Sequence, residues 1–365
     1  MSERRLKKIV LTGGGTAGHV IPNLALLPSL LGEGWSVEYI GSVSGMEKGL
    51  VEKAGIPFHS IASGKLRRYF DLRNFVDPFR VLWGIAQAWR LLGRLRPHLV
   101  FSKGGFVAVP VVYAASLRGI PVLIHESDQS PGLANRLCLP FANVICVAFP
   151  ETLRLLPAGK TVLTGAPIRA ELLTGVRSRG LAFCGFAIPG PGAPAPLPVL
   201  LIMGGSLGSR ALNHAVRRDL PQLRGSFQVV HICGRGALDP RWEGKDGYRQ
   251  FEFVGPELPD VLAAADLVLS RAGANAIFEF LALRKPNLLV PLPMGASRGD
   301  QIHNARAFAA LGYSRVLMEE QMIEDRLLME LKALTAGAEV YREAMGASPF
   351  RNGVEKIMEQ IRLYQ

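Results

Sequence analysis

Residues 270–304 combine a tight turn with charged and amide side chains that suit ligand binding. The segment reads as a strand end, a glycine turn, a helix from about Ala274, a second strand and a polar loop. Gly273 allows the backbone to turn sharply into that helix. The first four amides of a helix lack intrahelical partners and the helix dipole adds positive potential there, so this turn predicts an anion site, such as one for a phosphate.

Polar side chains near this turn suit the hydroxyls of a sugar. Glu279 lies among apolar residues of the helix, where its carboxylate suits a ribose diol. After the rigid segment 291–293 comes a polar run in which Asp300, Gln301 and Asn304 suit further sugar hydroxyls. An ordinary strand-helix-strand unit with a solvated glutamate is the structural alternative.

The loop GGGTAGH at residues 13–19 lies between a strand at 8–11 and an apolar helix at about 21–31. Its glycines satisfy the GxGxxG pattern, so a nicotinamide- or flavin-dependent enzyme is one alternative. That fold needs an acid at the end of its second strand, whereas here Ile40 runs into Gly41 and Ser42. His19 follows the last glycine, where the positive end of a helix favours a neutral imidazole that accepts a proton. A capping or merely solvated histidine is the alternative.

Two further motifs follow strands of the first half. FSKGGFVAVP, at residues 101–110, places two glycines between a strand and a helix. HESD follows the strand at 122–124 and brings His125, Glu126 and Asp128 to the strand-end rim where His19 is expected. Alternatively, Asp128 or Ser130 caps the helix that follows.

Strands and helices alternate through the chain, which predicts parallel, doubly wound sheets. Strand signals occur at 8–11, 37–40, 58–61, 99–102, 122–124 and 144–147, and again at 199–203, 229–233, 251–254, 267–270, 288–291 and 314–317. We therefore expect two Rossmann-like α/β domains that face each other across a ligand-binding cleft. Residues 1–174 form the first, residues 175–198 a Gly/Pro-rich linker, and residues 199–365 the second.

Composition narrows the protein class. A chain of 365 residues with 48% hydrophobic content supports two cores. The cysteines lack a CxxC pair or metal-ligand spacing, which predicts no disulfide, no metal site and a reducing, cytosolic compartment; they are Cys138, Cys146, Cys184 and Cys233. No stretch has the length of a signal sequence or membrane span. Residues 1–164 hold 19 Lys and Arg against 10 Asp and Glu, but no nucleic-acid-binding signature, so we expect no nucleic acid partner.

Taken together, the motifs resemble one family along nearly the whole chain. They are GGGTAGHVIPNLAL, SKGGF, HESD, GAPIR at 165–169, GGSLGS at 204–209, SRAGANAIFE and DQIHNA. The combination is similar to the undecaprenyldiphospho-muramoylpentapeptide N-acetylglucosaminyltransferases, which make lipid II of bacterial peptidoglycan. The resemblance implies a GT-B fold and an inverting transfer of N-acetylglucosamine from UDP-N-acetylglucosamine to the 4-hydroxyl of the N-acetylmuramyl group of lipid I. The N-terminal domain would hold lipid I and the C-terminal domain the nucleotide sugar.

The resemblance also assigns residues to this reaction. It implies that His19 is a catalytic base, with Glu126 and Asp128 of HESD as the other candidates. The residues implied to contact the donor are Thr16, Ala17, Gly18, Asp128, Arg169, Ser206, the backbone of Val254, Ala274, Asn275, Ala276, Ile277, Phe278, Glu279 and Gln301. The family usually has HEQN in place of HESD, so Asp128 exchanges a donor-and-acceptor amide for an acceptor-only carboxylate. Without a DxD-like carboxylate pair, we expect helix N-termini rather than a metal to stabilise the departing diphosphate, and no cofactor.

Three other functions remain open on the sequence alone. A related transferase acting on diacylglycerol or another lipid would share every donor motif. A dehydrogenase would bind a nicotinamide. A non-catalytic protein would bind the nucleotide sugar without turnover.

The most basic and aromatic stretch, residues 65–96, predicts contact with an anionic membrane surface. On a helix from about Asn74, one stripe is the expected core face and carries Phe75, Phe79, Leu82, Ala86 and Trp89. The neighbouring stripe is the expected membrane face and carries Arg80, Trp83, Gln87, Arg90 and Arg94. We therefore expect a peripheral protein on the cytoplasmic face of the membrane; a packed helix with solvated arginines is the alternative.

Overall fold

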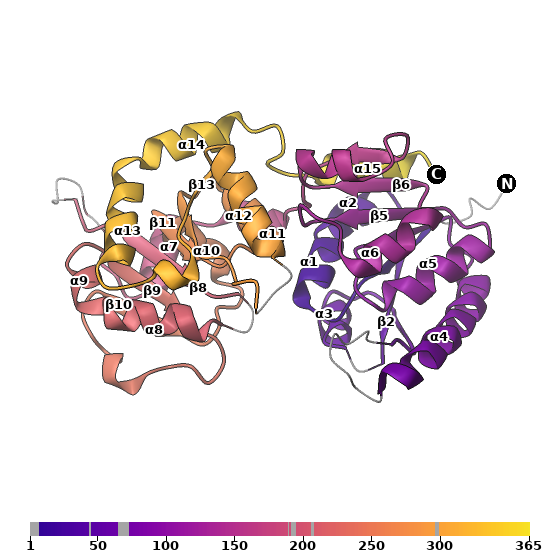
Figure 1. The fold of residues 1–365 in the computed structure, drawn as a ribbon, viewed down its shortest axis with the longest axis horizontal. Coiled ribbons are helices and arrows are strands. Elements are labelled where there is room, and N and C mark those ends of the chain that lie inside the picture. Colours follow the sequence, from indigo (N-terminus) through magenta and orange to yellow (C-terminus); the bar gives the residue numbers. More distant parts are fainter. Residues whose placement is uncertain are drawn as a thin grey trace. The chain divides into compact units, whose positions relative to one another are not determined.

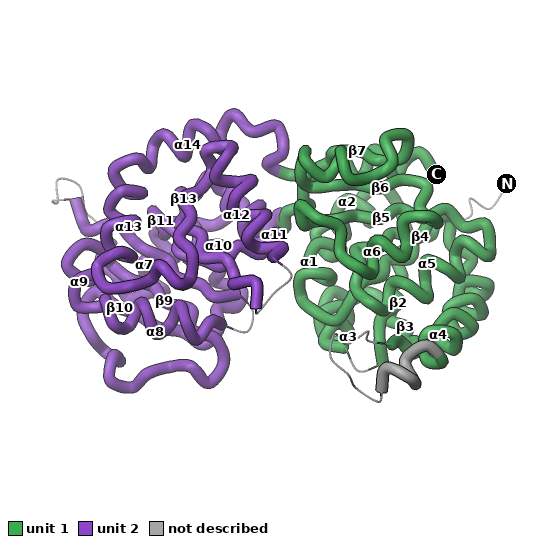
Figure 2. Tube along the Cα trace, in the orientation of Figure 1, with its two compact units in different colours: residues 1–169, 352–365 green, residues 170–351 purple. Residues whose placement is uncertain are grey.

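A computed structural model describes residues 7–43, 45–64, 73–188, 190, 195–205, 208–295 and 299–365, with backbone alone for 73–78. The chain forms two compact units, coloured separately in Figure 2. Unit 1 comprises residues 1–169 and 352–365, and unit 2 comprises residues 170–351. The boundary thus falls five residues before the one we expected, and the C-terminal segment belongs to unit 1 rather than to the second domain.

Unit 1 is built on a seven-stranded parallel sheet in the order β3-β2-β1-β4-β5-β6-β7 (Figure 1). Its strands are β1 Lys8–Thr12, β2 Ser36–Ser42, β3 Phe58–Ile61, β4 Leu99–Ser102, β5 Val122–Glu126, β6 Val144–Val147 and β7 Thr161–Leu163. The central strands are buried on both faces, as expected for a parallel sheet covered by helices. The expected doubly wound sheet is confirmed.

Successive side chains of each strand point to opposite sides of the sheet, so apolar side chains lie on both faces. Helices cover both of these faces. The helices are α1 Ala17–Ala25, α2 Leu27–Gly32, α3 Glu47–Lys53, α4 Arg73–Leu95, α5 Ala108–Leu117, α6 Leu133–Cys138 and α15 Val354–Arg362, with 3-10 turns η1 Leu139–Phe141 and η2 Pro150–Leu155. Val10 of β1 packs in the core that α4 and α5 complete. Ile9 and Leu11 pack in the opposite core, with α1, α2, α3 and α15.

The C-terminal helix α15 completes the core of unit 1. Ile357, Met358 and Ile361 are fully buried against β1 and β2. Gly353, just before the helix, donates its N–H to the Ala166 carbonyl at 2.8 Å, and a Cβ there would lie 2.7 Å from the Gly165 carbonyl oxygen. This close approach requires glycine at position 353, so the sequence allows the C-terminal segment to pack on unit 1.

Unit 2 holds a six-stranded parallel sheet in the order β10-β9-β8-β11-β12-β13. The strands are β8 Val199–Met203, β9 Gln228–Ile232, β10 Tyr248–Phe251, β11 Leu267–Ser270, β12 Asn287–Leu289 and β13 Ser314–Val316. The helices are α7 Arg177–Phe183, α8 Arg210–Arg218, α9 Leu220–Arg224, α10 Leu258–Ala264, α11 Ala274–Ala282, α12 Asp300–Ala310, α13 Arg326–Ala336 and α14 Ala338–Ala347, with 3-10 turns η3 Ala170–Thr174, η4 Pro240–Trp242 and η5 Glu319–Gln321. The second predicted sheet is therefore present as well.

Residues 175–198, predicted as a linker, are partly folded into unit 2. Helix α7 packs on α10 so closely that a Cβ on Gly180 would lie 2.0 Å from the Asp260 carbonyl oxygen. Arg177 and Arg179 form ion pairs with Asp266 and Asp260. The glycine that looked like loop composition therefore allows two helices to touch, and the linker prediction was wrong for residues 177–183.

Helix α4 turns a different face to the core than the sequence pattern predicted. Gly84 and Ala88 are buried, and a Cβ on Gly84 would lie 2.2 Å from the Ala62 carbonyl oxygen. The helix packs through these small residues together with Leu91 and Leu92. Among the described members of the stripe expected in the core, Phe79 is 72% and Leu82 63% exposed, and the side chain of Phe75 lies outside the described residues. None of the helices in the described ranges is long and apolar enough to cross a lipid bilayer.

Candidate active site

The loop between β1 and α1 places His19 inside the first turn of a helix. Helix α1 begins at Ala17, four residues earlier than predicted, and Thr16 is its N-cap residue in extended conformation. Nδ1 of His19 lies 3.0 Å from the Gly14 carbonyl oxygen and 3.2 Å from Oγ1 of Thr16. A carbonyl oxygen only accepts, so Nδ1 carries the proton in this arrangement and Nε2 is the basic nitrogen.

The glycines of this loop pack directly on those of the SKGGF motif. Gly105 has φ +83°, and a Cβ there would lie 2.3 Å from the Gly14 carbonyl oxygen. The loop is also held by Glu47, a fully buried carboxylate that accepts from the backbone N–H groups of Gly15 at 3.3 Å and Ser42 at 2.8 Å. Glu47 escaped the sequence analysis, because its position in the first turn of an ordinary surface-type helix gives no sign of burial.

The HESD motif presents its carboxylates unequally. Glu126 is buried, and its two oxygens accept from the N–H groups of Asp128 and Gly132 at 2.9 Å each and from Nδ2 of Asn135 at 2.8 Å. Three donors aimed at one carboxylate satisfy its oxygens and fix its position. Asp128 is half-buried beside it. Of the two, Asp128 is therefore the carboxylate placed to reach a ligand.

A buried lysine joins three loops of unit 1. Nζ of Lys103 lies 2.8 Å from Nδ1 of His125 and also donates to Oγ of Ser127. Nε2 of His125 lies 2.9 Å from the Gly165 carbonyl oxygen, at the start of the GAPIR segment that ends in Arg169. Burial lowers the pKa of Lys103 to about 8, and burial together with the Lys103 ammonium lowers the pKa of His125 well below its usual value. His125 is thus a neutral, internal connector rather than a surface base.

Lys103 was not singled out from the sequence, although a signal existed. It follows a fully buried strand directly and precedes two glycines with positive φ, Gly104 and Gly105. A charged residue in such a place is either exposed at the rim or buried with hydrogen-bond partners. The structure shows the second case.

In unit 2, the carboxyl ends of the adjacent strands β8, β11 and β12 lie at one edge of the sheet. The GGSLGS loop follows β8, but Ser206 lies outside the described residues. After β11, Gly273 is the N-cap of α11 and supplies no side chain to the first amides of that helix. The predicted helix N-terminus is therefore present, with α11 starting at Ala274, and anion binding there stays a prediction.

The first two turns of α11 divide into a buried and an open face. Ala274, Ile277 and Phe278 are buried, so their side chains serve the core and a ligand would meet their backbone. Asn275, Ala276 and Glu279 are half-buried on the other face, at helical positions that neighbour one another. The carboxylate of Glu279 therefore shares the open face with the start of the helix.

The structure also describes three other residues of unit 2 that the sequence analysis singled out, Gln301, Asn304 and Val254. Oε1 of Gln301, in the first turn of α12, accepts from the Leu292 N–H at 3.1 Å and so fixes the loop after β12. Asn304, expected to suit sugar hydroxyls, is fully buried and donates to the Ala272 carbonyl at 3.3 Å, so its role is structural. Val254 is buried in the loop after β10, where a backbone contact is the one available to it.

Arg271 is a second buried cation that the sequence analysis missed. Its guanidinium donates to Oγ of Ser209 at 2.7 Å and to the carbonyl oxygens of Val290 and Pro291 at 3.1 and 3.3 Å, and it pairs with Glu319. Arg271 thereby ties the GGSLGS loop to the turn before α11 and to the loop after β12. No group of three or more His, Cys, Asp or Glu in the described ranges could hold a metal ion.

Family models match most of the chain. Residues 9–147 match the glycosyltransferase family 28 N-terminal domain, and residues 199–361 match the glycosyltransferase family 28 C-terminal domain. The first match lies within unit 1, and the second covers most of unit 2 and continues into the C-terminal segment of unit 1.

Individual relatives agree with these models. A protein of Lachnoclostridium phytofermentans is 55% identical, covering 98% of this chain and 100% of its own, and one of Clostridium botulinum strain Langeland is 52% identical, covering 98% and 99%. Both are named UDP-N-acetylglucosamine--N-acetylmuramyl-(pentapeptide) pyrophosphoryl-undecaprenol N-acetylglucosamine transferase.

Solved structures share the fold. The crystal structure of Acinetobacter baumannii MurG is 27% identical, with a TM-score of 0.73 and coverage of 98% of this chain and 99% of that one. The glycosyltransferase of kitacinnamycin, 17% identical with a TM-score of 0.74 and 99% coverage of both chains, shows the same two-domain fold alone. With full-length relatives above half identity, this chain belongs to glycosyltransferase family 28 and, within it, to the family of transferases that add N-acetylglucosamine to N-acetylmuramyl-(pentapeptide) pyrophosphoryl-undecaprenol.

Proposed function

We propose that this protein transfers N-acetylglucosamine from UDP-N-acetylglucosamine to the 4-hydroxyl of the N-acetylmuramyl group of lipid I, giving lipid II for peptidoglycan. The observation that carries this function is 55% identity along 98% of the chain to a transferase of that name. The strand-end loops of both units support it, because every loop motif of the family falls at a sheet edge where α/β folds bind ligands.

Unit 2 holds the donor in this proposal. The diphosphate lies at the N-terminus of α11, where the amides of residues 274–276 and the helix dipole favour negative charge. Glu279 accepts from the ribose hydroxyls, since it shares the open face of the helix with that N-terminus. The other residues proposed to contact the nucleotide sugar are Gln301, Arg169, Ser206 and the backbone of Val254.

His19 acts as the base in this proposal. Nε2 takes the proton from the 4-hydroxyl while the oxygen attacks C1 of N-acetylglucosamine, and the bond from C1 to the diphosphate breaks to release UDP. Attack from the face opposite the leaving group inverts the anomeric centre. Gly14 and Thr16 hold Nδ1, which orients the ring. Thr16, Ala17 and Gly18 contact the donor through the first turn of α1.

Asp128 is the alternative base. It is half-buried, whereas the oxygens of Glu126 are occupied by three hydrogen-bond donors, so Glu126 positions the motif instead. Asp128 also stands where the family usually has asparagine. Its carboxylate accepts hydrogen bonds from the donor sugar but offers none.

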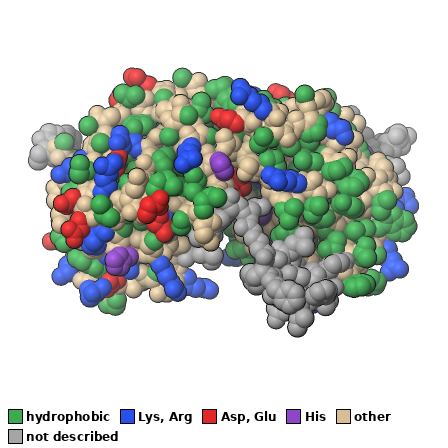
Figure 3. Space-filling model, viewed as in Figure 1, with side chains coloured by type: hydrophobic (Ala, Val, Ile, Leu, Met, Phe, Trp, Pro, Cys, Tyr) green, Lys and Arg blue, Asp and Glu red, His purple; other side chains and the backbone are tan. Residues whose placement is uncertain are grey.

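Helix α4 places the protein on an anionic membrane surface, on the cytoplasmic face where UDP-sugars are used. Phe79, Leu82 and Trp83 are exposed on the described part of the helix, with Arg80 and Arg90 beside them. In Figure 3, hydrophobic side chains gather on the part of unit 1 that carries α4 and α5. Exposed aromatic and aliphatic side chains among arginines are typical of helices that lie in a membrane interface.

One assay separates this function from its alternatives. Purified protein with UDP-N-acetylglucosamine and a short-chain lipid I analogue should release UDP and form the disaccharide product. Diacylglycerol in place of the analogue should give no UDP release. Turnover with diacylglycerol alone would assign the chain to another lipid acceptor, and donor binding without turnover on either acceptor would make it a binding protein.

A further inference from the structure

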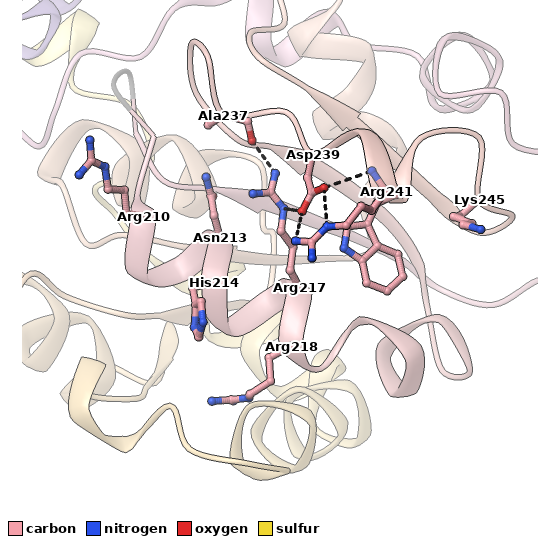
Figure 4. Close-up of a pocket in the computed structure, with 10 residues that line it drawn as sticks. Arg210, Asn213, His214, Arg217, Arg218, Ala237, Asp239, Arg241 and Lys245 are labelled. Carbon is pink, nitrogen blue, oxygen red and sulfur yellow. Dashed lines mark hydrogen bonds and ion pairs between the residues drawn. The ribbon is translucent and has the colours of Figure 1, made fainter.

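A pocket of about 710 Å³ lies on unit 2, between the outer face of α8 and the loop that joins β9 to β10 (Figure 4). Its α8 wall carries Arg210, His214 and Arg217, which are spaced four and three residues apart and so lie along one stripe of the helix. The opposite wall carries Arg241, Trp242 and Lys245. None of these residues belongs to the donor site proposed above.

The ion pairs within the pocket leave an excess of positive charge. Asp239 is its only lining carboxylate among the described residues and is held by Arg241, with Nη2 2.7 Å from Oδ2. Arg218 is paired with Asp219, 2.6 Å away, at the end of α8. In the described part of the chain, no side-chain partner is present for Arg210 or Lys245.

Arg217 adds an unsatisfied donor to this excess. Its Nη2 donates to the Ala237 carbonyl, but its Nε is buried and has no hydrogen-bond partner in the described structure. The nearest carboxylate oxygen, Oδ2 of Asp239, is 3.9 Å from that atom. A buried guanidinium N–H without an acceptor costs free energy that an incoming oxyanion would recover.

We propose that this pocket is a second anion site that binds a small diphosphate-bearing molecule. Two cationic walls favour an anion with charge at both ends, since Arg210 and Lys245 lie at opposite ends of the pocket in Figure 4. The volume exceeds that of a single phosphate. The half-buried indole of Trp242 lines the remaining wall and suits a flat or apolar group attached to the diphosphate.

The test is calorimetric titration of inorganic pyrophosphate into the full-length protein with one equivalent of UDP present, so that UDP fills the donor site and leaves the second site free. We expect one pyrophosphate per chain. The double variant Arg210→Gln with Lys245→Gln keeps every ion pair of the pocket and should bind pyrophosphate at least about tenfold more weakly, because two cations are lost. Its affinity for UDP should be unchanged, which shows that the fold is retained.

The matched control is Arg306→Gln with Lys332→Gln, which removes two exposed cations of unit 2 outside the pocket. Equal weakening in both double variants, or pyrophosphate binding that one equivalent of UDP abolishes, would overturn the proposal. Failure of the wild-type protein to bind UDP would instead contradict the proposed function. Pyrophosphate binding that is weakened by Glu279→Ala and not by the pocket variant would place pyrophosphate in the donor site and overturn the second site. The pocket variant should cosediment with phosphatidylglycerol vesicles as well as the wild type does. If the variant lost vesicle binding and kept its pyrophosphate affinity, the pocket would bind lipid headgroups, and the proposal of a soluble diphosphate ligand would be overturned.

Discussion

Nζ of Lys103 lies 2.8 Å from Nδ1 of His125, and both side chains are almost fully buried. Because Nε2 of His125 lies 2.9 Å from the Gly165 carbonyl oxygen, the imidazole accepts from the lysine at Nδ1 and donates at Nε2. This chain of bonds connects the SKGGF, HESD and GAPIR loops. Three loops that carry motifs of the family thus share one internal support.

The lysine makes stability depend on pH. Burial lowers the pKa of Lys103 to about 8, whereas the unfolded chain keeps the ordinary lysine value. Above pH 8 the unfolded state therefore binds more protons than the folded state, and the free energy of unfolding rises with pH. Between about pH 7.5 and 9.5 this residue should contribute a rise of about 2 kcal/mol, measured by urea unfolding.

The comparison is with Lys103→Met, which removes the titrating group but keeps a long side chain. The variant should be less stable at neutral pH, because Nδ1 of His125 loses its donor, and its stability should rise less over the same pH range. Lys285 also has a pKa lowered by burial, to about 8, and contributes equally to both proteins. Parallel pH profiles for the two proteins would contradict the assignment.

The sequence predicted the strands and the loops that follow them because the rules for these elements are local. Gly273 and Glu279 belong to one strand, turn and helix segment, so the chain order alone predicts that they lie together. Parallel strands bring their carboxyl ends to one edge of the sheet, which predicts where that segment lies. Start positions of helices were less secure. Helix α1 begins at Ala17, within the glycine-rich segment, whereas the apolar pattern predicted a start at about residue 21.

The same local rules could not predict which charged side chains are buried. Glu47, Lys103 and Arg271 hold loops through partners that lie far away in sequence, and no spacing rule predicts such contacts. On α4, hydrophobicity predicted the wrong face, because Gly84 and Ala88 allow a closer approach than bulky side chains. Small residues give a weak hydrophobic signal even where they form the contact.

Glu279→Ala should weaken binding of UDP-N-acetylglucosamine by about 1–3 kcal/mol, the loss expected for hydrogen bonds to a charged acceptor. The fold should survive, since the residue is half-buried on the open face of α11. Calorimetry with UDP measures the change directly. UDP affinity equal to that of the wild type would remove Glu279 from the donor site.

His19→Ala should lower kcat by about 100-fold or more and leave donor affinity nearly intact, because a base acts on the acceptor proton in the transition state. Steady-state turnover with the lipid I analogue gives kcat, and calorimetry gives the affinity for UDP. His19→Gln keeps a polar side chain near Gly14 but has no basic nitrogen, so it should be equally slow.

Asp128→Asn and Glu126→Gln test the alternative bases. Asp128→Asn restores the residue usual in the family and should keep turnover if His19 is the base. Glu126→Gln replaces one carboxylate oxygen with an N–H₂ that faces at least one hydrogen-bond donor, and should cost about 1–3 kcal/mol of stability, seen in urea unfolding. Near-normal kcat in His19→Ala together with a large loss in Asp128→Asn would transfer the role to Asp128.

Membrane docking through α4 is tested by Trp83→Ala combined with Arg80→Glu and Arg90→Glu. All three residues are exposed, with Trp83 56% exposed, so the changes should leave the fold intact. Each basic residue near an anionic surface contributes about 1 kcal/mol, and charge reversal adds repulsion, so cosedimentation with phosphatidylglycerol vesicles should be largely lost. Binding of the wild type should weaken as salt is added, because exposed charges are screened.

The exposed apolar side chains on the described part of α4 also predict a contribution to vesicle binding that does not depend on charge. Phe79→Ala with Leu82→Ala keeps every charge and should reduce vesicle binding at high salt as well, since burial of apolar surface in the interface is not screened. A matched control on unit 2, Leu311→Ala with Arg306→Glu and Lys332→Glu, removes similar groups and should bind vesicles almost as well as the wild type. Vesicle binding that is indifferent to salt and to both α4 variants would rule out this helix, and the positive excess of residues 1–164 would then serve the diphosphate of the acceptor alone.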